Sequence, residues 1–206
     1  MSTTRLVLAT RNSGKIVEFR RILTKLHLRS IDLVGLEHFS DLPDVEETGG
    51  TFLENALLKA RTVCRATGLP AIADDSGLCI DALDGAPGVH SARWSGVHGN
   101  DSANIEKVLA QLEQTPEDKR GAHFTCVAAF VMPDGRESTA EAIMPGRILR
   151  QPIGTFGFGY DPIFLPEGSE LSLAELDAQK KDEISHRGQS LRAIAPRVAA
   201  MLGMLG

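Results

Sequence analysis

Two adjacent aspartates, Asp74 and Asp75, stand where an apolar segment meets a turn signal. They follow residues 71–73 in the sequence AIADDSGL, and Ser76 and Gly77 come directly after them. Asp-Ser-Gly is common turn chemistry, so one interpretation is a hairpin with its turn here. The other is a chemical site at a strand end, because neighbouring carboxylates can hold Mg²⁺ with substrate phosphates or separate their pKa values so that one acts as a base.

The two aspartates are expected to have different tasks, because adjacent residues of an extended segment point to opposite sides. A second acidic pair, Glu46 and Glu47, lies upstream in the loop-like stretch SDLPDVEETGGT. These glutamates are either further candidates for a carboxylate site or ordinary solvated charges of a loop.

The stretch ATRNSGK, residues 9–15, lies between an apolar run and a helical pattern. Backbone N–H groups at a helix start attract anions, and Lys15 adds a positive charge beside them. The stretch lacks the Walker A pattern G-x-x-x-x-G-K-[ST]. The alternative is that Asn12 and Ser13 are ordinary turn and cap residues and that Lys15 is solvated.

Two later segments have residue types suited to a nucleobase. In GFGYDPIF, residues 157–164, glycines flank Phe158, which leaves room for a base to stack on an exposed ring. In SHRG, residues 185–188, hydrogen-bond donors suited to a base edge lie next to a cation suited to phosphate. The alternatives are aromatic core packing for the first segment and a polar helix start for the second.

Hydrophobic periodicity predicts the elements that position these residues, in an order typical of an α/β protein. Strands are expected at 5–10, 29–36, on both sides of the turn at 74–77, and in a hairpin of 123–132 and 137–149 with its turn at 133–135. Helices are expected at 13 to about 26, at 52–67 after a capping box of Thr51 and Glu54, at 101–114, after a second capping box of Ser172 and Glu175, and at 189–202.

Composition excludes several classes of protein. The 206 residues, 42% of them hydrophobic, suit one folded domain without a dividing linker. No stretch approaches the roughly 18 apolar residues of a membrane span. A net charge of −5 without long runs of Lys and Arg disfavours nucleic acid as a partner. The three cysteines, Cys64, Cys79 and Cys126, form no C-x-x-C pattern and are expected to be free thiols in a reducing cytosol.

Six motifs in order resemble the inosine triphosphate pyrophosphatase family. They are LATRNSGK, EETGGTFLENALLKA, AIADDSGL, GAPGVHSARW, FGFGYDPIF and ISHRGQSLR, and they extend almost from end to end. Arg11 stands where many members have Gly. The resemblance implies a single domain over residues 1–206, with an elongated mixed β-sheet flanked by helices and two lobes around a nucleotide-binding cleft. It also implies a homodimer in the cytoplasm.

The same resemblance implies an Mg²⁺-dependent enzyme that hydrolyses ITP, dITP or XTP to the monophosphate and pyrophosphate. It implies that Glu47 and Asp75 bind the metal, that Asp75 accepts the proton and faces Glu47 and the Lys15 loop, and that Asp74 can share the base role. The triphosphate loop would be Thr10, Arg11, Asn12, Ser13, Gly14 and Lys15, and further substrate contacts would come from Lys59, Ser76, Arg93, Phe158, Gly159, Tyr160, Asp161, Lys181, His186 and Arg187.

Two rival functions stay open at this point. One is a pyrophosphatase for pyrimidine or modified nucleotides, and the other is a nucleotide-binding module without catalysis. The retained carboxylates and cations disfavour the second. A panel of purine and pyrimidine nucleoside triphosphates distinguishes the first rival from an enzyme for ITP, dITP or XTP.

Overall fold

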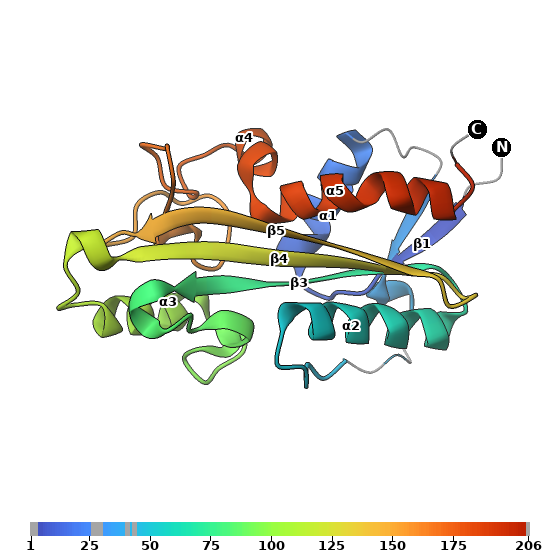
Figure 1. The fold of residues 1–206 in the computed structure, drawn as a ribbon, viewed down its shortest axis with the longest axis horizontal. Coiled ribbons are helices and arrows are strands. Elements are labelled where there is room, and N and C mark those ends of the chain that lie inside the picture. The colour runs from blue at the N-terminus through green and yellow to red at the C-terminus, as the bar shows by residue number, and fades with distance from the viewer. Residues whose placement is uncertain (1–3, 26–30, 40–41, 43–44, 205–206) are drawn as a thin grey trace. The chain divides into compact units, whose positions relative to one another are not determined.

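The structure, a computed structural model, describes residues 4–25, 31–39, 42 and 45–204 (Figure 1). Its strands are β1 (Thr4–Leu8), β2 (Ile31–Gly35), β3 (Ala71–Ile80), β4 (Gly121–Val131), β5 (Glu137–Ile148) and β6 (Phe164–Pro166). Its α-helices are α1 (Ser13–Lys25), α2 (Phe52–Thr67), α3 (Asp101–Gln111), α4 (Ala178–Ile184) and α5 (His186–Met201). None of the described helices is long and apolar enough to cross a membrane.

The six strands form one mixed sheet in the order β2-β1-β3-β4-β5-β6. Strand β1 runs parallel to β2 and to β3, whereas β6 runs antiparallel to β5. A mixed sheet flanked by helices confirms the predicted fold class.

The chain divides into two compact units, and β3, β4 and β5 each contribute residues to both. The first unit contains residues 1–75, 126–142 and 187–206. The second unit contains residues 76–125 and 143–186. Asp74 and Asp75 are thus the last β3 residues of the first unit, and Ser76 is the first residue of the second.

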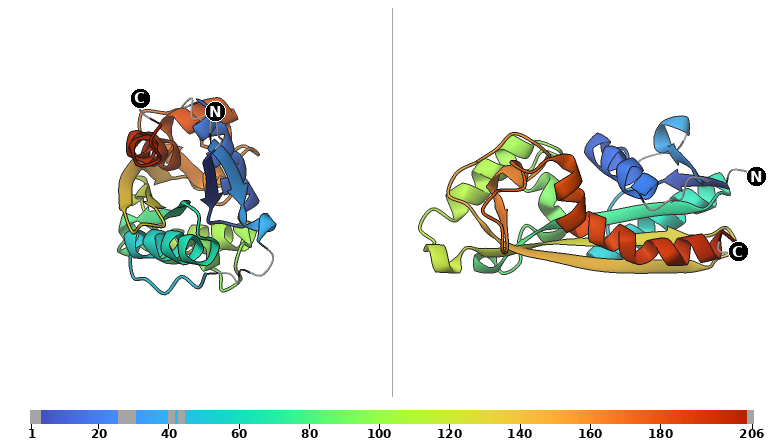
Figure 2. Two further views of the ribbon diagram at one scale, coloured as in Figure 1. Left: turned by 90° about the vertical axis from the view of Figure 1, so that its right-hand side faces the viewer. Right: turned by 90° about the horizontal axis from the view of Figure 1, so that it is seen from above.

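The first unit packs helices on both faces of its strands (Figures 1 and 2). Leu6 and Leu8 of β1 lie in one apolar cluster with residues of α1 and α5. Val7 lies in another cluster with residues of α2. Since successive residues of a strand point to opposite faces, β3 continues the pattern: Ile72 belongs to the α1 and α5 cluster, and Ala73 to the α2 cluster.

The second unit has a core of its own. Leu78 and Ile80 of β3 pack there with Val108 of α3 and with Phe124 of β4. Tyr160, in the loop before β6, is part of the same core. Three distant segments of the chain therefore hold the aromatic loop in place.

The predicted hairpin at Asp74–Gly77 is wrong, because β3 is one continuous strand from Ala71 to Ile80. This strand lies between β1 and β4 in the sheet, so neighbouring strands supply the backbone partners that a turn would supply locally. All of its residues except Ser76 are buried. The two carboxylates therefore belong to the middle of an inner strand and not to a turn at its end.

The capping-box prediction at Ser172 and Glu175 is also wrong as a helix start. The backbone N–H of Ser172 does donate to Glu175 Oε2 at 2.8 Å, but the Ser172 hydroxyl donates to the Ile153 carbonyl at 2.7 Å. The Ser172 hydroxyl therefore connects two loops and does not cap a helix. The next helix, α4, starts after Asp177, whose side chain accepts from two backbone N–H groups. Helix α5 starts at His186, before the predicted residue 189.

Other local predictions are confirmed. Thr51 and Glu54 form both hydrogen bonds of a capping box before α2, and Gly68 ends that helix in the left-handed conformation. The β4–β5 connection is a tight turn in which the backbone N–H of Met132 donates to the Arg136 carbonyl at 2.8 Å. Cys64, Cys79 and Cys126 are free and buried. The predicted helix end near Leu26 and part of the acidic loop, at 40–41 and 43–44, lie outside the described residues.

Candidate active site

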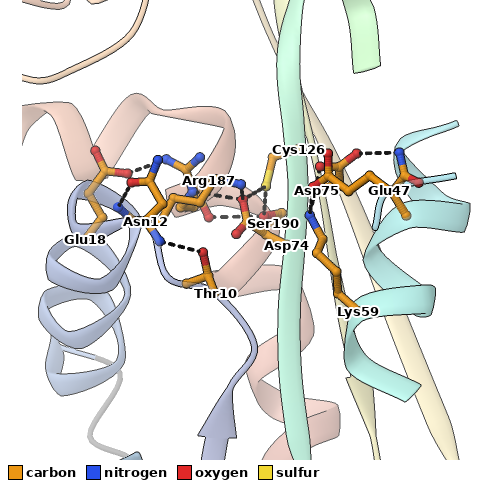
Figure 3. Close-up of polar contacts among 12 residues, drawn as sticks. Thr10, Asn12, Glu18, Glu47, Lys59, Asp74, Asp75, Cys126, Arg187 and Ser190 are labelled. Carbon is orange, nitrogen blue, oxygen red and sulfur yellow. Dashed lines mark hydrogen bonds and ion pairs between the residues drawn. The ribbon is translucent and has the colours of Figure 1, made fainter. Parts of the chain in front are cut away.

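Asp74 and Asp75 lie on opposite sides of β3, as Figure 3 shows. The exposed fraction of Asp74 is 1% and that of Asp75 is 5%. The alternation that sends Ile72 and Ala73 to opposite faces continues into the two carboxylates. Each aspartate therefore has a different set of partners.

Asp74 is held by two cations. Lys15 Nζ of α1 lies 3.0 Å from Asp74 Oδ2, and Arg187 Nε of α5 lies 3.1 Å from the same oxygen. Arg187 also makes a short ion pair with Glu18 of α1. Burial by itself raises the pKa of Asp74, but the charges of Lys15 and Arg187 outweigh it and lower this pKa. Asp74 is therefore ionised over the whole physiological range.

The Asp74 cluster extends to a thiol and a hydroxyl. Cys126 Sγ lies 3.8 Å from Asp74 Oδ2, and the Ser190 hydroxyl lies 3.2 Å from the same sulfur. Burial, with Asp74 as a secondary cause, raises the pKa of Cys126 to about 12. The thiol is thus protonated and unreactive at neutral pH.

Asp75 belongs to a separate cluster on α2. Lys59 Nζ lies 2.9 Å from Asp75 Oδ1 and 2.7 Å from Glu47 Oε1, so one ammonium bridges two carboxylates. The Asn55 amide donates to Asp75 Oδ2 at 3.2 Å. Asn55 and Lys59 share one face of α2 because they are four residues apart. Asn55 Oδ1 also accepts from the Gly49 backbone at 2.8 Å, which ties the acidic loop to the helix.

The pKa of Asp75 is raised, in contrast to that of Asp74. Burial is the main cause and outweighs the opposing charges of Lys59 and Lys15, while repulsion from Glu47 adds a smaller upward shift. The pKa of Lys59 is raised as well: burial lowers it, but attraction to Asp75 and Glu47 is stronger. Two adjacent carboxylates with oppositely shifted pKa values are the pattern expected for separate structural and acid–base tasks.

Lys15 forms its ion pair with Asp74, although the resemblance places Asp75 toward the Lys15 loop. In the same loop, the Asn12 side chain accepts from the Lys15 backbone at 3.0 Å, and Thr10 Oγ1 accepts from the Asn12 backbone at 3.2 Å. Arg11 reaches the Leu42 carbonyl at 2.7 Å. Ser13 begins α1. The turn-and-cap interpretation thus holds for Asn12 and Ser13, but its expectation of a solvated Lys15 is wrong, because Lys15 pairs with Asp74.

The aromatic loop of the second unit is organised around Asp161. Asp161 Oδ2 accepts from the Phe158 backbone at 2.9 Å and lies 2.5 Å from Lys181 Nζ. The same ammonium lies 4.7 Å from the centre of the Phe158 ring. Gly157 has a φ of 79°, and a Cβ there would overlap the Asp161 carboxylate. Glycine is therefore required at that position.

Two contacts attach this loop to the rest of the second unit. The Gly159 backbone donates to Asp101 at 2.7 Å, and the Tyr160 hydroxyl donates to the Ser91 carbonyl at 2.9 Å. The Tyr160 side chain is buried in the core, where its ring positions the loop. Burial, with Asp101 as a secondary cause, raises the pKa of the phenol.

The candidate residues from the sequence fall into two groups. The first unit contains Thr10, Arg11, Asn12, Ser13, Gly14, Lys15, Glu47, Lys59, Asp74, Asp75 and Arg187. The second unit contains Ser76, Arg93, Phe158, Gly159, Tyr160, Asp161, Lys181 and His186. Ser76 and Arg93 are half-buried. Sequence reasoning missed Glu18 and Asn55, which helical spacing from Lys15 and Lys59 places on the same helix faces.

Glu47 and Asp75 have the donor atoms of a divalent metal site. Their oxygens converge on one cation, Lys59 Nζ, and carboxylate oxygens are donors that Mg²⁺ prefers. Among the residues that the structure describes, no three His, Cys, Asp or Glu side chains form a metal-binding group. Mg²⁺ commonly takes one or two carboxylates and completes its shell with water and substrate phosphates. The two carboxylates fit that use.

The fold and the site define an α/β protein with two buried charge clusters on opposite faces of one strand. The sequence model of the Ham1 family matches residues 6–197, and the chain belongs to this family. A relative from Streptomyces avermitilis, named dITP/XTP pyrophosphatase, is 56% identical over 97% of this chain and 100% of its own length. A relative of the same name from Nocardia farcinica is 48% identical over 98% of each chain.

Solved structures agree with the family assignment. A HAM1 protein from Coxiella burnetii has a TM-score of 0.84 and 43% identity, over 96% of this chain and 99% of its own. The Ham1 protein from Staphylococcus aureus has a TM-score of 0.84 and 37% identity, over 96% of this chain and 100% of its own. The family resemblance of the sequence is thus confirmed.

Proposed function

We propose that this protein is a nucleoside-triphosphate pyrophosphatase that hydrolyses ITP, dITP and XTP to the monophosphate and pyrophosphate. Such an activity removes deaminated purines from the nucleotide pool. The observation that carries the proposal is the placement of Asp75 beside Glu47 and Lys59 on one side of β3, with Asp74 held by Lys15 and Arg187 on the other. The names of the relatives from Streptomyces avermitilis and Nocardia farcinica support the same activity.

In this proposal Asp75 accepts the proton of the attacking water. Its raised pKa brings it closer to the working pH, which favours general-base catalysis. Asp74 holds Lys15 and Arg187 in place instead, because its lowered pKa makes it a poor proton acceptor. Lys59 contributes positive charge next to the base, where negative charge builds up during phosphoryl transfer.

Glu47 and Asp75 would hold Mg²⁺ in the presence of substrate. The metal supplies charge compensation for the phosphate oxygens and the pyrophosphate leaving group. The loop from Thr10 to Lys15 binds the triphosphate through backbone N–H groups at the start of α1.

The second unit recognises the base. Phe158 provides a ring for stacking, and Lys181, held by Asp161, provides a donor for the 6-keto oxygen. Adenine has an amino group at that position, so its binding would leave the donor unpaired and cost affinity. The homodimer and the cytoplasmic location remain predictions of the family resemblance.

A panel of nucleotides with and without Mg²⁺ tests the proposed function. We expect ITP, dITP and XTP to be converted faster than ATP, GTP, dUTP and dTTP, and only when Mg²⁺ is present. Phosphorus NMR of the products separates pyrophosphate release from stepwise loss of orthophosphate. Preference for dUTP or dTTP would favour the pyrimidine alternative, and tight ITP binding without turnover would favour a binding module.

Removing the Phe158 ring tests the stacking role. In Phe158→Ala, the KM for ITP should rise while kcat changes little, because stacking acts on bound substrate and transition state alike. A loss of about 1–3 kcal/mol corresponds to a rise of roughly 5- to 150-fold. Phe156→Ala is the matched control, because Phe156 lies in the same loop and is 61% exposed. Equal KM changes in both variants would contradict the assignment.

A further inference from the structure

The imidazole of His186 is stacked face to face on the ring of Phe124. The ring centres are 4.6 Å apart, and the ring planes differ by 6°. Both residues belong to the second unit and are buried, with exposed fractions of 5% for His186 and 7% for Phe124. His186 is the first residue of α5, whereas Phe124 lies in β4. The stack therefore joins a helix start to the sheet.

Phe124 is itself held by the core of the second unit. Its ring centre lies 4.7 Å from that of Phe164 in β6, with the ring planes at 56°. Phe124 and Phe164 belong to the same buried cluster as Leu78 and Met144. Residues of β3 and β5 belong to this cluster together with Phe164, so several neighbours surround the Phe124 ring.

The position of His186 also depends on a short connection from α4. Ser185 is extended, with φ of −64° and ψ of 147°, and its backbone donates to the Lys181 carbonyl at 2.8 Å. The backbone therefore fixes the position of the His186 Cα. The χ2 torsion, which rotates the imidazole ring, has only a broad, roughly two-fold preference. The stacked Phe124 ring favours one plane for it.

We propose that Phe124 is a positioning residue for base recognition, because it selects the plane of the His186 imidazole. Hydrogen bonds to ring nitrogens lie in the plane of the ring, so the plane decides in which direction His186 can donate or accept. The inference rests on the proposed function and on the prediction from the sequence that the SHRG segment, which contains His186, meets the edge of the base. It adds a residue of β4 that none of the predicted substrate contacts includes.

Phe124→Leu tests the inference, because it keeps an apolar side chain and removes the ring. The KM for ITP should rise about two- to tenfold, the range of an aromatic pair, with kcat nearly unchanged. The ratio of kcat/KM for ITP over ATP should fall by a similar factor. Phe164→Leu is the matched control: Phe164 is also buried and touches Phe124, and its loss should lower stability with little change in KM.

Proton NMR of the full-length protein gives a readout that does not depend on turnover. The ring protons of His186 should lie upfield in the native protein, because they sit over the Phe124 ring, and should move downfield in Phe124→Leu. They should keep most of the upfield shift in Phe164→Leu. Phe124→Tyr restores the ring and should restore both the shift and the KM, even if the buried hydroxyl lowers the melting temperature.

Three outcomes would overturn the inference. They are unchanged His186 shifts in Phe124→Leu, equal KM changes in Phe124→Leu and Phe164→Leu, or a Phe124→Tyr variant that behaves like Phe124→Leu in both assays. Failure of the proposed function is a separate result. If the native protein does not hydrolyse ITP, the proposed function fails, but the NMR shifts of His186 still test whether Phe124 sets the plane of its ring.

Discussion

Asp75→Asn should abolish pyrophosphate release from ITP and leave the protein folded. An amide in place of the carboxylate cannot accept the proton of water, and general-base catalysis contributes about 10²- to 10⁴-fold in rate. It is also a weaker ligand for Mg²⁺. The loss should appear in kcat, measured as pyrophosphate release with saturating Mg²⁺ and ITP.

The fold should survive because Asn has nearly the shape of Asp and Lys59 retains its ion pair with Glu47. The amide oxygen can still accept the hydrogen bond from Asn55. In addition, burial already disfavours the charged form of Asp75, as its raised pKa shows. Circular dichroism and the melting temperature should therefore be close to those of the native protein.

Asp118→Asn is a suitable control, because Asp118 is an exposed carboxylate of the second unit and should be dispensable for turnover. Near-normal pyrophosphate release from a folded Asp75→Asn protein would remove Asp75 from the catalytic role. An unfolded Asp75→Asn protein would instead show that the carboxylate is structural.

Asp74→Asn should have its main effect on stability. The substitution removes the charge that the half-buried Lys15 and the buried Arg187 share, and it leaves Arg187 with its ion pair to Glu18. Breaking a buried ion pair in this way costs about 3–5 kcal/mol. Urea unfolding at pH 7 measures the change in the free energy of unfolding.

An exposed ion pair provides the control for that measurement. Glu137 pairs with Arg61 at 2.6 Å, but their side chains are 37% and 49% exposed. Such surface pairs contribute about 0–1 kcal/mol, so Glu137→Gln should change stability little. Equal stability of Asp74→Asn and the native protein would contradict the structural role. A folded, fully stable Asp74→Asn protein without activity would make Asp74 a catalytic group.

The effect of Asp74→Asn should depend on pH with a definite sign. Because the pKa of Asp74 is lowered in the folded protein, its stabilising contribution is fully present above the unfolded value of about 3.9. It is lost as the pH falls below that value toward the folded pKa. The stability difference between native and variant proteins should therefore be constant from pH 5 to 7 and shrink below about pH 4.

Much of the local structure follows from the order of residue types. The capping box at Thr51 and the glycine at Gly68 mark both ends of α2, because these signals are satisfied within a few residues. The continuous apolar run of β1 likewise indicates a strand that is buried on both faces. By contrast, Ser172 and Glu175 show the same capping signal without a helix, because the Ser172 hydroxyl bonds to a carbonyl nineteen residues away.

For the candidate site, the order of residues is enough to name the charged and aromatic side chains and to predict that Asp74 and Asp75, if extended, point to opposite sides. It does not show that the DDSG segment is the interior of a strand, because β1 and β4 supply its neighbours from distant parts of the chain. The tertiary structure also determines which cation each aspartate meets. Lys15 and Arg187 lie on α1 and α5, and Lys59 lies on α2. Packing of those helices on opposite faces is what gives two adjacent aspartates opposite pKa shifts.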